Sequence, residues 1–211
     1  MKNSNYSLRS YRKEDMASLI RILLSTWTYD NMSSEENRGK ATELFLLSYL
    51  VVSDHRYVLL DKNNIIGIIL AHETGIDIEA KQEYEEKRSL FCKDKDVASL
   101  LVYNDIIHSV NDRLAEECSP KGKEITLLIL DPSHRNRGLG AFLLQELYTH
   151  LEGPFYLFSD LDCSYSFYLR NGFRIQAEKE EEYSFFGKRK TFHSFLFVQI
   201  ETKESAYANQ T

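Results

Sequence analysis

The stretch "LLILDPSHRNRGLGAFLLQEL", residues 127–147, decides the fold of this chain. An uninterrupted apolar run leads into a short loop that holds Arg135 and Arg137, and Gly138 and Gly140 follow where a helical pattern begins. The first N–H groups of a helix lack internal partners and carry a partial positive charge. A strand, loop and helix of this kind therefore predict a site for phosphate oxygens.

Two common nucleotide motifs do not fit this loop. The dinucleotide-binding fingerprint places a third glycine three residues after the second, and Leu143 stands there instead. The P-loop ends in Gly-Lys-Ser or Gly-Lys-Thr, and neither tripeptide follows these glycines. The sequence alone therefore predicts a phosphate-bearing ligand of another kind.

The composition limits the class of protein. The 211 residues are 43% apolar and carry a net charge of -6, which argues against nucleic acid as a partner because phosphate neutralisation needs clustered basic residues. The three cysteines are widely spaced, and neither they nor the histidines show metal-ligand spacing. The N-terminus lacks the apolar segment of a signal peptide, and no apolar run is long enough to span a bilayer. We expect a cytoplasmic protein with no membrane partner and no metal.

Periodicity predicts a single α/β domain over residues 1–211, with the order β-α-α-β-β-(α-α)-β-α-β-α-β-β. We expect a mixed, mostly antiparallel sheet flanked by helices, with one parallel β-α-β unit over residues 125–159. The final two strands should join at Gly187 and Lys188, and the tail 201–211 should fray. The first helix should bury a face made of Met16, Leu19, Ile20, Leu23 and Leu24.

Two motifs together resemble the GCN5-related N-acetyltransferase (GNAT) superfamily. Residues 135–140, "RNRGLG", match its R/Q-x-x-G-x-G/A signature between a strand and a helix, and residues 167–173, "FYLRNGF", look like its F-Y-x-x-x-G-F segment. The opening "LRSYRKEDMASLIRILL", residues 8–24, is also similar to the usual first strand and helix of the family. The resemblance covers most of the chain outside residues 74–120.

The resemblance implies acetyl-CoA as the cosubstrate. In the family, backbone amides of this loop hold the pyrophosphate, and the backbone of the preceding strand pairs with pantetheine and polarises the thioester carbonyl. Carried onto this sequence, the expected cofactor-binding residues are Leu130, Arg135, Asn136, Arg137, Gly138, Leu139, Gly140 and Ala141. The glycines should also let the ligand approach the backbone, because they carry no Cβ atom.

The resemblance also implies two catalytic candidates. The family often uses the tyrosine at the position of Tyr168 to protonate the departing CoA thiolate, although an aromatic that only packs on the sheet is the alternative. Glu124 opens the apolar strand eleven residues before Arg135, where histone-type members carry their general base, and a charged strand end is the equal alternative. Both residues are therefore hypotheses about an N-acetyltransferase mechanism.

Several other polar residues have simpler interpretations. Asp131, Asp160 and Asp162 follow the two parallel strands, and a turn or cap role is favoured over that of a base. Cys163 is expected to be a buried structural thiol, and His134 a loop residue that faces solvent. The acidic run 178–183 is typical of a solvated strand edge.

The sequence leaves the acceptor open. A primary amine of a small molecule is the first expectation, a protein N-terminus or lysine is the second, and a non-catalytic acyl-CoA sensor is the third. The helical insertion 74–120 either covers the acceptor side of the cleft or forms the contact of a homodimer. The apolar stripe of its second helix is predicted to be Val97, Leu100, Leu101, Ile107, Val110 and Leu114.

Overall fold

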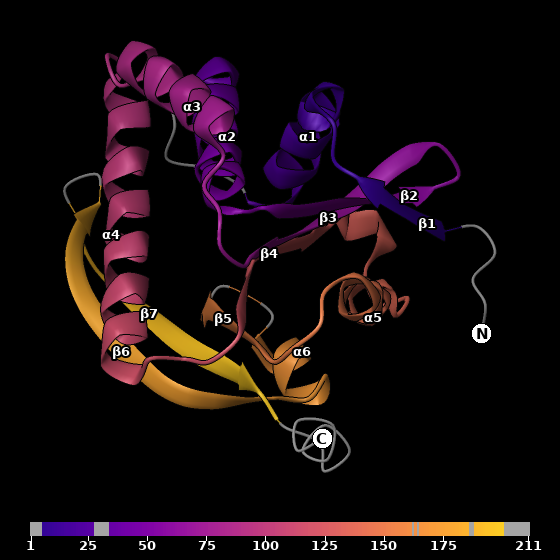
Figure 1. Ribbon diagram of the computed structural model, residues 1–211. Helices are drawn as coiled ribbons and strands as arrows, with labels where there is room; N and C mark the ends of the chain where they lie inside the picture. Colours follow the sequence, from indigo (N-terminus) through magenta and orange to yellow (C-terminus); the bar gives the residue numbers. More distant parts are fainter. Residues whose placement is uncertain (1–5, 28–33, 162, 164, 186–187, 201–211) are drawn as a thin grey trace.

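A computed structural model describes residues 6–27, 34–161, 163, 165–185 and 188–200. In this part of the chain, seven strands form one sheet in the order β1-β2-β3-β4-β5-β7-β6 (Figure 1). The strands β4 and β5 are parallel, and every other neighbouring pair is antiparallel. The predicted mixed sheet with one parallel β-α-β unit is confirmed.

The order of strands and helices also agrees with the prediction. The strands are β1 (Tyr6–Ser10), β2 (His55–Asp61), β3 (Asn64–His72), β4 (Lys123–Leu130), β5 (Phe155–Asp160), β6 (Phe173–Phe185) and β7 (Lys188–Gln199). The helices are α1 (Met16–Thr26), α2 (Glu35–Val52), α3 (Ile78–Phe91), α4 (Lys95–Cys118), α5 (Leu139–His150) and α6 (Tyr165–Arg170). The predicted β6–β7 junction at Gly187 and the tail 201–211 lie outside the described residues.

The sheet divides the core into two layers. Figure 1 shows α1 and α2 on one face of the strands β1–β4 and α5 on the other. The first layer joins the apolar sides of α1 and α2 to Val58, Ile68, Leu70, Leu127 and Ile129. The second packs α5 against residues that include Ala71, Ile125 and Phe155. Burial of these side chains is the main stabilising contribution of each layer.

The buried face of α1 differs from the predicted one. Leu19, Ile22 and Leu23 are at most 1% exposed, whereas Ile20 and Leu24 are only partly buried. The two faces share Leu19 and Leu23, but the helix is rotated so that Ile22 reaches the sheet. The helix is apolar around most of its circumference, so several buried faces are consistent with its periodicity. Periodicity alone therefore did not determine which face of α1 packs against the sheet.

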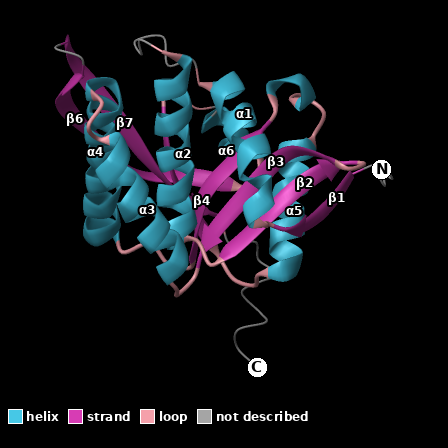
Figure 2. Ribbon diagram, turned by 90° about the horizontal axis from the view of Figure 1, so that it is seen from above, coloured by secondary structure: helices cyan, strands magenta, loops and turns pink. Residues whose placement is uncertain are grey.

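The insertion between β3 and β4 consists of α3 and α4, as predicted. Figures 1 and 2 show α4 lying along the β6–β7 hairpin, with α3 beside α2. Arg113 of α4 forms an ion pair with Glu181 of β6 at 2.9 Å, and Lys179 of β6 pairs with Glu117 of α4. The apolar stripe of α4 is buried except at Ile107, which is partly buried. The insertion therefore packs against the chain's own hairpin.

A β-bulge in β4 sets the direction of its side chains. The register with β3 shifts between Leu70, opposite Leu127, and Ala71, opposite Ile125, so Thr126 is the extra residue. As a result Ile125 packs in the α5 layer while Leu127 packs in the α1–α2 layer. Without the bulge, these two residues would share one face of the sheet. The Thr126 hydroxyl is hydrogen-bonded to that of Ser53 at the end of α2, at 2.7 Å.

Candidate functional site

The strands β4 and β5 separate soon after they begin. Their parallel pairing joins Lys123 to Phe155 and Glu124 to Tyr156, and β5 then pairs with β7 on its other side along its length to Asp160. The two strands thus form a V whose vertex lies at Glu124. Such an opening at the carboxyl ends of parallel strands is where α/β proteins bind ligands.

The backbone of β4 directs polar groups into this V. The Asp131 N–H donates to the Ile66 carbonyl oxygen at 2.8 Å. In an antiparallel ladder hydrogen-bonded and non-bonded pairs alternate, so the N–H and C=O groups of Leu128 and Leu130 point away from β3. They face the side on which β5 has separated. The predicted candidate Leu130 therefore presents its backbone at the opening.

The loop between β4 and α5 exposes the start of a helix. Asn136 and Gly138 have φ values of +61° and +76°, and a Cβ on Gly138 would meet nothing within 4 Å. The N-cap Gly138 offers no side-chain cap, and the first helical bond of α5 runs from the Phe142 N–H to the Gly138 carbonyl at 3.0 Å. The amides of residues 139–141 thus have no acceptor within the helix. This arrangement can receive an anionic group.

Gly140 has a packing role, which corrects the expectation that both glycines admit a ligand. It is buried, and a Cβ there would lie 2.9 Å from the ring of Phe167 in α6. The side chain of Leu130 packs against the same glycine, since a Cβ on Gly140 would lie 3.8 Å from it. It also packs against Gly67 of β3, where a Cβ would lie 2.7 Å away. The two sequence motifs, 135–140 and 167–173, are thus in direct contact through Gly140 and Phe167.

The side chains of the loop hold its shape. The Asp131 carboxylate accepts the Ser133 N–H at 2.8 Å, so the predicted cap role of Asp131 is confirmed. His134 does not simply face solvent, since it is partly buried and lies 3.7 Å from the carboxylate of Asp61. Arg135 donates to the Thr26 hydroxyl at 3.2 Å, and Arg137 donates to the carbonyl of Ser133 at 3.0 Å. Both arginines are exposed at the mouth of the loop.

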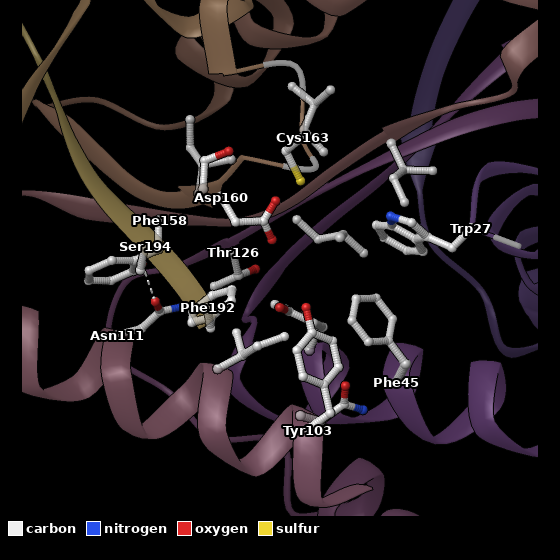
Figure 3. Close-up of a pocket in the computed structure, with 18 of the residues that line it drawn as sticks. Trp27, Phe45, Tyr103, Asn111, Thr126, Phe158, Asp160, Cys163, Phe192 and Ser194 are labelled. Atoms are coloured by element: carbon white, nitrogen blue, oxygen red, sulfur yellow. Dashed lines mark hydrogen bonds between the residues drawn. The ribbon is translucent and has the colours of Figure 1, made fainter. Parts of the chain in front are cut away.

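A cavity of about 320 Å³ continues from the V beneath α2 and α4. Figure 3 shows aromatic side chains facing one another across it, with the Asn111 amide oxygen accepting a 2.7 Å hydrogen bond from the Ser194 hydroxyl at its base. The wall contains eight aromatic residues, drawn from elements far apart in the sequence: Trp27, Phe45, Tyr49, Tyr103, Phe158, Tyr168, Tyr183 and Phe192. Apart from Tyr168, sequence reasoning missed these residues, because no spacing along the chain links them.

Tyr168 lines this cavity from the short helix α6. Its ring contacts those of Phe167, Phe173 and Phe197, with centroids 5.2–6.0 Å apart. Burial, with the nearby Cys163 and Asp160, raises the pKa of the Tyr168 phenol above its ordinary value. The hydroxyl therefore keeps its proton at neutral pH and is able to donate it. Both interpretations made from the sequence, packing and proton donation, are compatible with this position.

Glu124 lies at the vertex of the V rather than on the cavity wall. Burial, with repulsion from Asp112, raises the pKa of its carboxyl to about 7, while a hydrogen bond with the Tyr156 hydroxyl opposes the shift. Burial likewise raises the pKa of Tyr156 to about 12, so this tyrosine is a donor. A carboxyl poised near neutrality is suited to proton transfer, which a solvated strand end is not.

Asp160 stands on the cavity wall, at the last position of β5 (Figure 3). A turn or cap role was expected for Asp160, but its carboxylate points into the cavity. Beside it, burial and the Asp160 charge raise the pKa of the Cys163 thiol to about 12, which agrees with an inert structural cysteine. Asp162 lies outside the described residues.

Most of the sequence matches a known family. The model of the acetyltransferase (GNAT) family matches residues 16–173, and the chain belongs to this family. Its members use acetyl-CoA as the cosubstrate. No curated protein gives a significant match. Over the described residues, no helix combines the length and apolar character needed to cross a membrane, and no three or more His, Cys, Asp or Glu side chains group as metal ligands.

Solved structures share the fold at low identity. A "histone acetyltransferase HPA2 and related acetyltransferase" from Corynebacterium glutamicum is 16% identical, with 94% of this chain and 97% of that chain covered and a TM-score of 0.59. A protein described as a phosphinothricin N-acetyltransferase is 15% identical, with coverages of 93% and 99% and a TM-score of 0.55. The ribosomal-protein-S18-alanine N-acetyltransferase of Escherichia coli is 12% identical, with 94% and 97% covered and a TM-score of 0.53.

Proposed function

We propose that this acetyltransferase moves the acetyl group of acetyl-CoA to a primary amine of a small molecule. The observation that carries the proposal is the V between β4 and β5, which joins an exposed helix start at one end to an aromatic cavity at the other. A thioester arm laid in the V would place its reactive carbon between the two.

The cosubstrate would be held mainly by backbone groups. The amides of residues 135–141 would receive the pyrophosphate, as the open space at Gly138 and the unbonded first turn of α5 support. The backbone of Leu130 would pair with the pantetheine arm. The N–H groups that β4 directs into the V would polarise the thioester carbonyl, and one such donor typically contributes about 3 kcal/mol to transition-state stabilisation.

The chemistry then needs two proton transfers. The amine nitrogen attacks the thioester carbon, and the tetrahedral intermediate collapses as the C–S bond breaks and the N–C bond remains. Glu124 would take the amine proton through a chain of water molecules, because it lies at the vertex of the V and not on the cavity wall, and its pKa of about 7 suits that task. Tyr168 would protonate the leaving CoA thiolate and regain its proton from solvent.

The position of α4 favours a small acceptor over a protein. An open groove is expected of an enzyme that acetylates a protein terminus or lysine. Here α4 instead supplies Leu100, Tyr103, Asn104, Ile107 and Asn111 to the cavity wall. In this proposal the insertion would cover the acceptor side, which is one of the two roles expected for it from the sequence. The structural relatives are named for both small-molecule and protein acceptors, so they do not decide the question.

The test combines binding and turnover. Acetyl-CoA at a hundred times its Kd should stabilise the folded protein by about 2.7 kcal/mol in thermal unfolding. Free CoA thiol should then appear when a primary amine is added. Gly138→Asp should abolish both signals, since it places a carboxylate where the phosphates would lie.

Gly138→Asn is the matched control, because it has the same size without the charge and asparagine tolerates a positive φ. Both side chains fill the same space, so Gly138→Asn should lose less of the stabilisation than Gly138→Asp, and the difference measures charge repulsion. Stabilisation without CoA release from any amine would identify a sensor instead of an enzyme. Absence of stabilisation at saturating acetyl-CoA would contradict the proposal.

A further inference from the structure

The cavity has features that the cosubstrate does not use. The V accounts for contacts along β4 and at Tyr168, but the far wall is made by the end of α1, by α2, by α4 and by the β6–β7 hairpin. A pantetheine arm is narrow and largely polar, so it does not explain this aromatic wall. The acceptor must occupy the space that remains.

The aromatic rings form a connected surface. Trp27 meets Phe45 edge-on with centroids 4.9 Å apart, and Phe45 continues to Tyr49 at 4.8 Å. Tyr103 of α4 stacks on Tyr183 of β6 at 5.3 Å. Rings held by other rings keep their orientation, and they offer flat apolar faces to a ligand. Figure 3 shows Trp27, Phe45 and Tyr103 around one space.

The cavity wall carries one carboxylate, that of Asp160, among its described residues. Among the described lining residues the charged side chains are Asp160 and Lys190, and Lys190 is exposed at the rim of the β6–β7 hairpin. Asp160 directs its carboxylate toward the space that the three rings face (Figure 3). Tyr168 lines the same cavity, and the charge of Asp160 contributes to the raised pKa of its phenol. A cation at Asp160 would therefore be next to the place where the thiolate departs.

Resting on the proposed function, we propose that the acceptor is a primary amine attached to an aromatic or similarly flat apolar group. Asp160 holds its ammonium group, and Trp27, Phe45 and Tyr103 hold its ring. The helix α4 is then the element that sets acceptor specificity, through Tyr103. Short polar amines fill none of the aromatic space, and lysine side chains bring a peptide that α4 obstructs.

The single tryptophan of the chain gives a direct measurement. Trp27 is the only tryptophan in the sequence and lies on the cavity wall, so its fluorescence reports occupancy without any turnover. In the presence of CoA, phenylethylamine should change this fluorescence with saturation, and ethanolamine should not. In the CoA-release assay the KM of phenylethylamine should be at least about tenfold lower than that of ethanolamine.

Two variants separate the parts of the site. Asp160→Asn should raise the Kd of phenylethylamine about tenfold in the fluorescence titration. The Kd of phenylethanol, its neutral analogue, should stay unchanged. Tyr103→Ala should raise the KM of phenylethylamine about tenfold with a smaller change in kcat, because a ring contact acts on ground and transition states alike. Val102→Ala is the control on the same helix, since Val102 is 53% exposed on another face. If Tyr103→Ala does not fold, Phe45→Leu takes its place.

The outcomes distinguish the two proposals. Equal use of ethanolamine or a lysine peptide, or no response of Trp27 to phenylethylamine while acetyl-CoA still stabilises the protein, overturns the aromatic acceptor alone. Failure of acetyl-CoA to stabilise the protein, with no CoA release from any amine, removes the proposed function itself.

Discussion

The two walls of the V are built in different ways. The cofactor wall consists of β4, the loop 131–138 and the start of α5, which are continuous in sequence and present mainly backbone groups. The acceptor wall gathers single side chains from α1, α2, α4 and the β6–β7 hairpin. In the proposed function, the backbone groups would hold the cosubstrate, and the side chains of the other wall would contact the acceptor. Side chains can be substituted one at a time without altering the backbone, so the acceptor could change while the cosubstrate site is kept.

The largest effect is expected where the walls meet, at Tyr168. Tyr168→Phe keeps the ring that packs against Phe167, Phe173 and Phe197 but removes the proton donor. We expect kcat to fall about 100-fold with little change in KM or in melting temperature. Steady-state release of CoA thiol measures the change.

Tyr165→Phe is the control from the same helix, since Tyr165 stacks on Phe195 and does not line the cavity. It should leave kcat unchanged. A loss in Tyr168→Phe of less than about threefold, well short of general-acid catalysis, would assign Tyr168 to packing alone.

The second effect concerns the pH dependence set by Glu124. A base must be deprotonated to act, so kcat/KM should fall as pH drops through about 7, the pKa of Glu124. Glu124→Gln should lose this limb and retain only the limb that belongs to the acceptor amine. The rate at a pH of about 7.5 should fall about tenfold. If the fall of kcat/KM at low pH persists in Glu124→Gln and disappears in Asp160→Asn, Asp160 is the base.

Stability gives a second measurement on the same variant. Folding raises the pKa of Glu124, so its contribution to stability is fully present below the unfolded pKa of about 4.5 and is lost as pH rises through about 7. The charged form therefore destabilises the folded protein by about 3 kcal/mol at a pH of about 8. Glu124→Gln should melt higher than the wild type at that pH and equally at a pH of about 4. Glu116→Gln, at an exposed position on α4, should change neither.

The cofactor wall was largely predictable from the sequence, and the acceptor wall was not. The run 127–147 places a strand, a loop and a helix in consecutive order, and local rules for each apply directly. Asp160 and the aromatic wall depend on how α4 lies on the hairpin, which no local pattern specifies. The rotation of α1 was missed for the same reason, because contact with the sheet buries Ile22 in preference to Ile20.

A smaller effect distinguishes two helical glycines. Gly39 lies inside α2, and a Cβ at this position would meet nothing within 4 Å, so Gly39→Ala should add about 1 kcal/mol to the free energy of unfolding. Gly140→Ala would press on Phe167 at 2.9 Å and should cost about 1 kcal/mol, because the ring must shift. Urea unfolding of both variants measures the difference. Stabilisation of equal size in both would contradict the packing role of Gly140.

The smallest effect tests whether the cofactor wall acts through its backbone. Arg135 and Arg137 are exposed, and each already donates a hydrogen bond within the protein, to Thr26 and to Ser133. If the amides of the loop hold the pyrophosphate, Arg135→Ala and Arg137→Ala should each raise the Kd of acetyl-CoA by less than about threefold. Exposed charges contribute little because salt screens them. Calorimetric titration at low and high salt measures this. Losses above about tenfold that shrink at high salt would mean that side chains carry the binding, and the contrast between the two walls would then disappear.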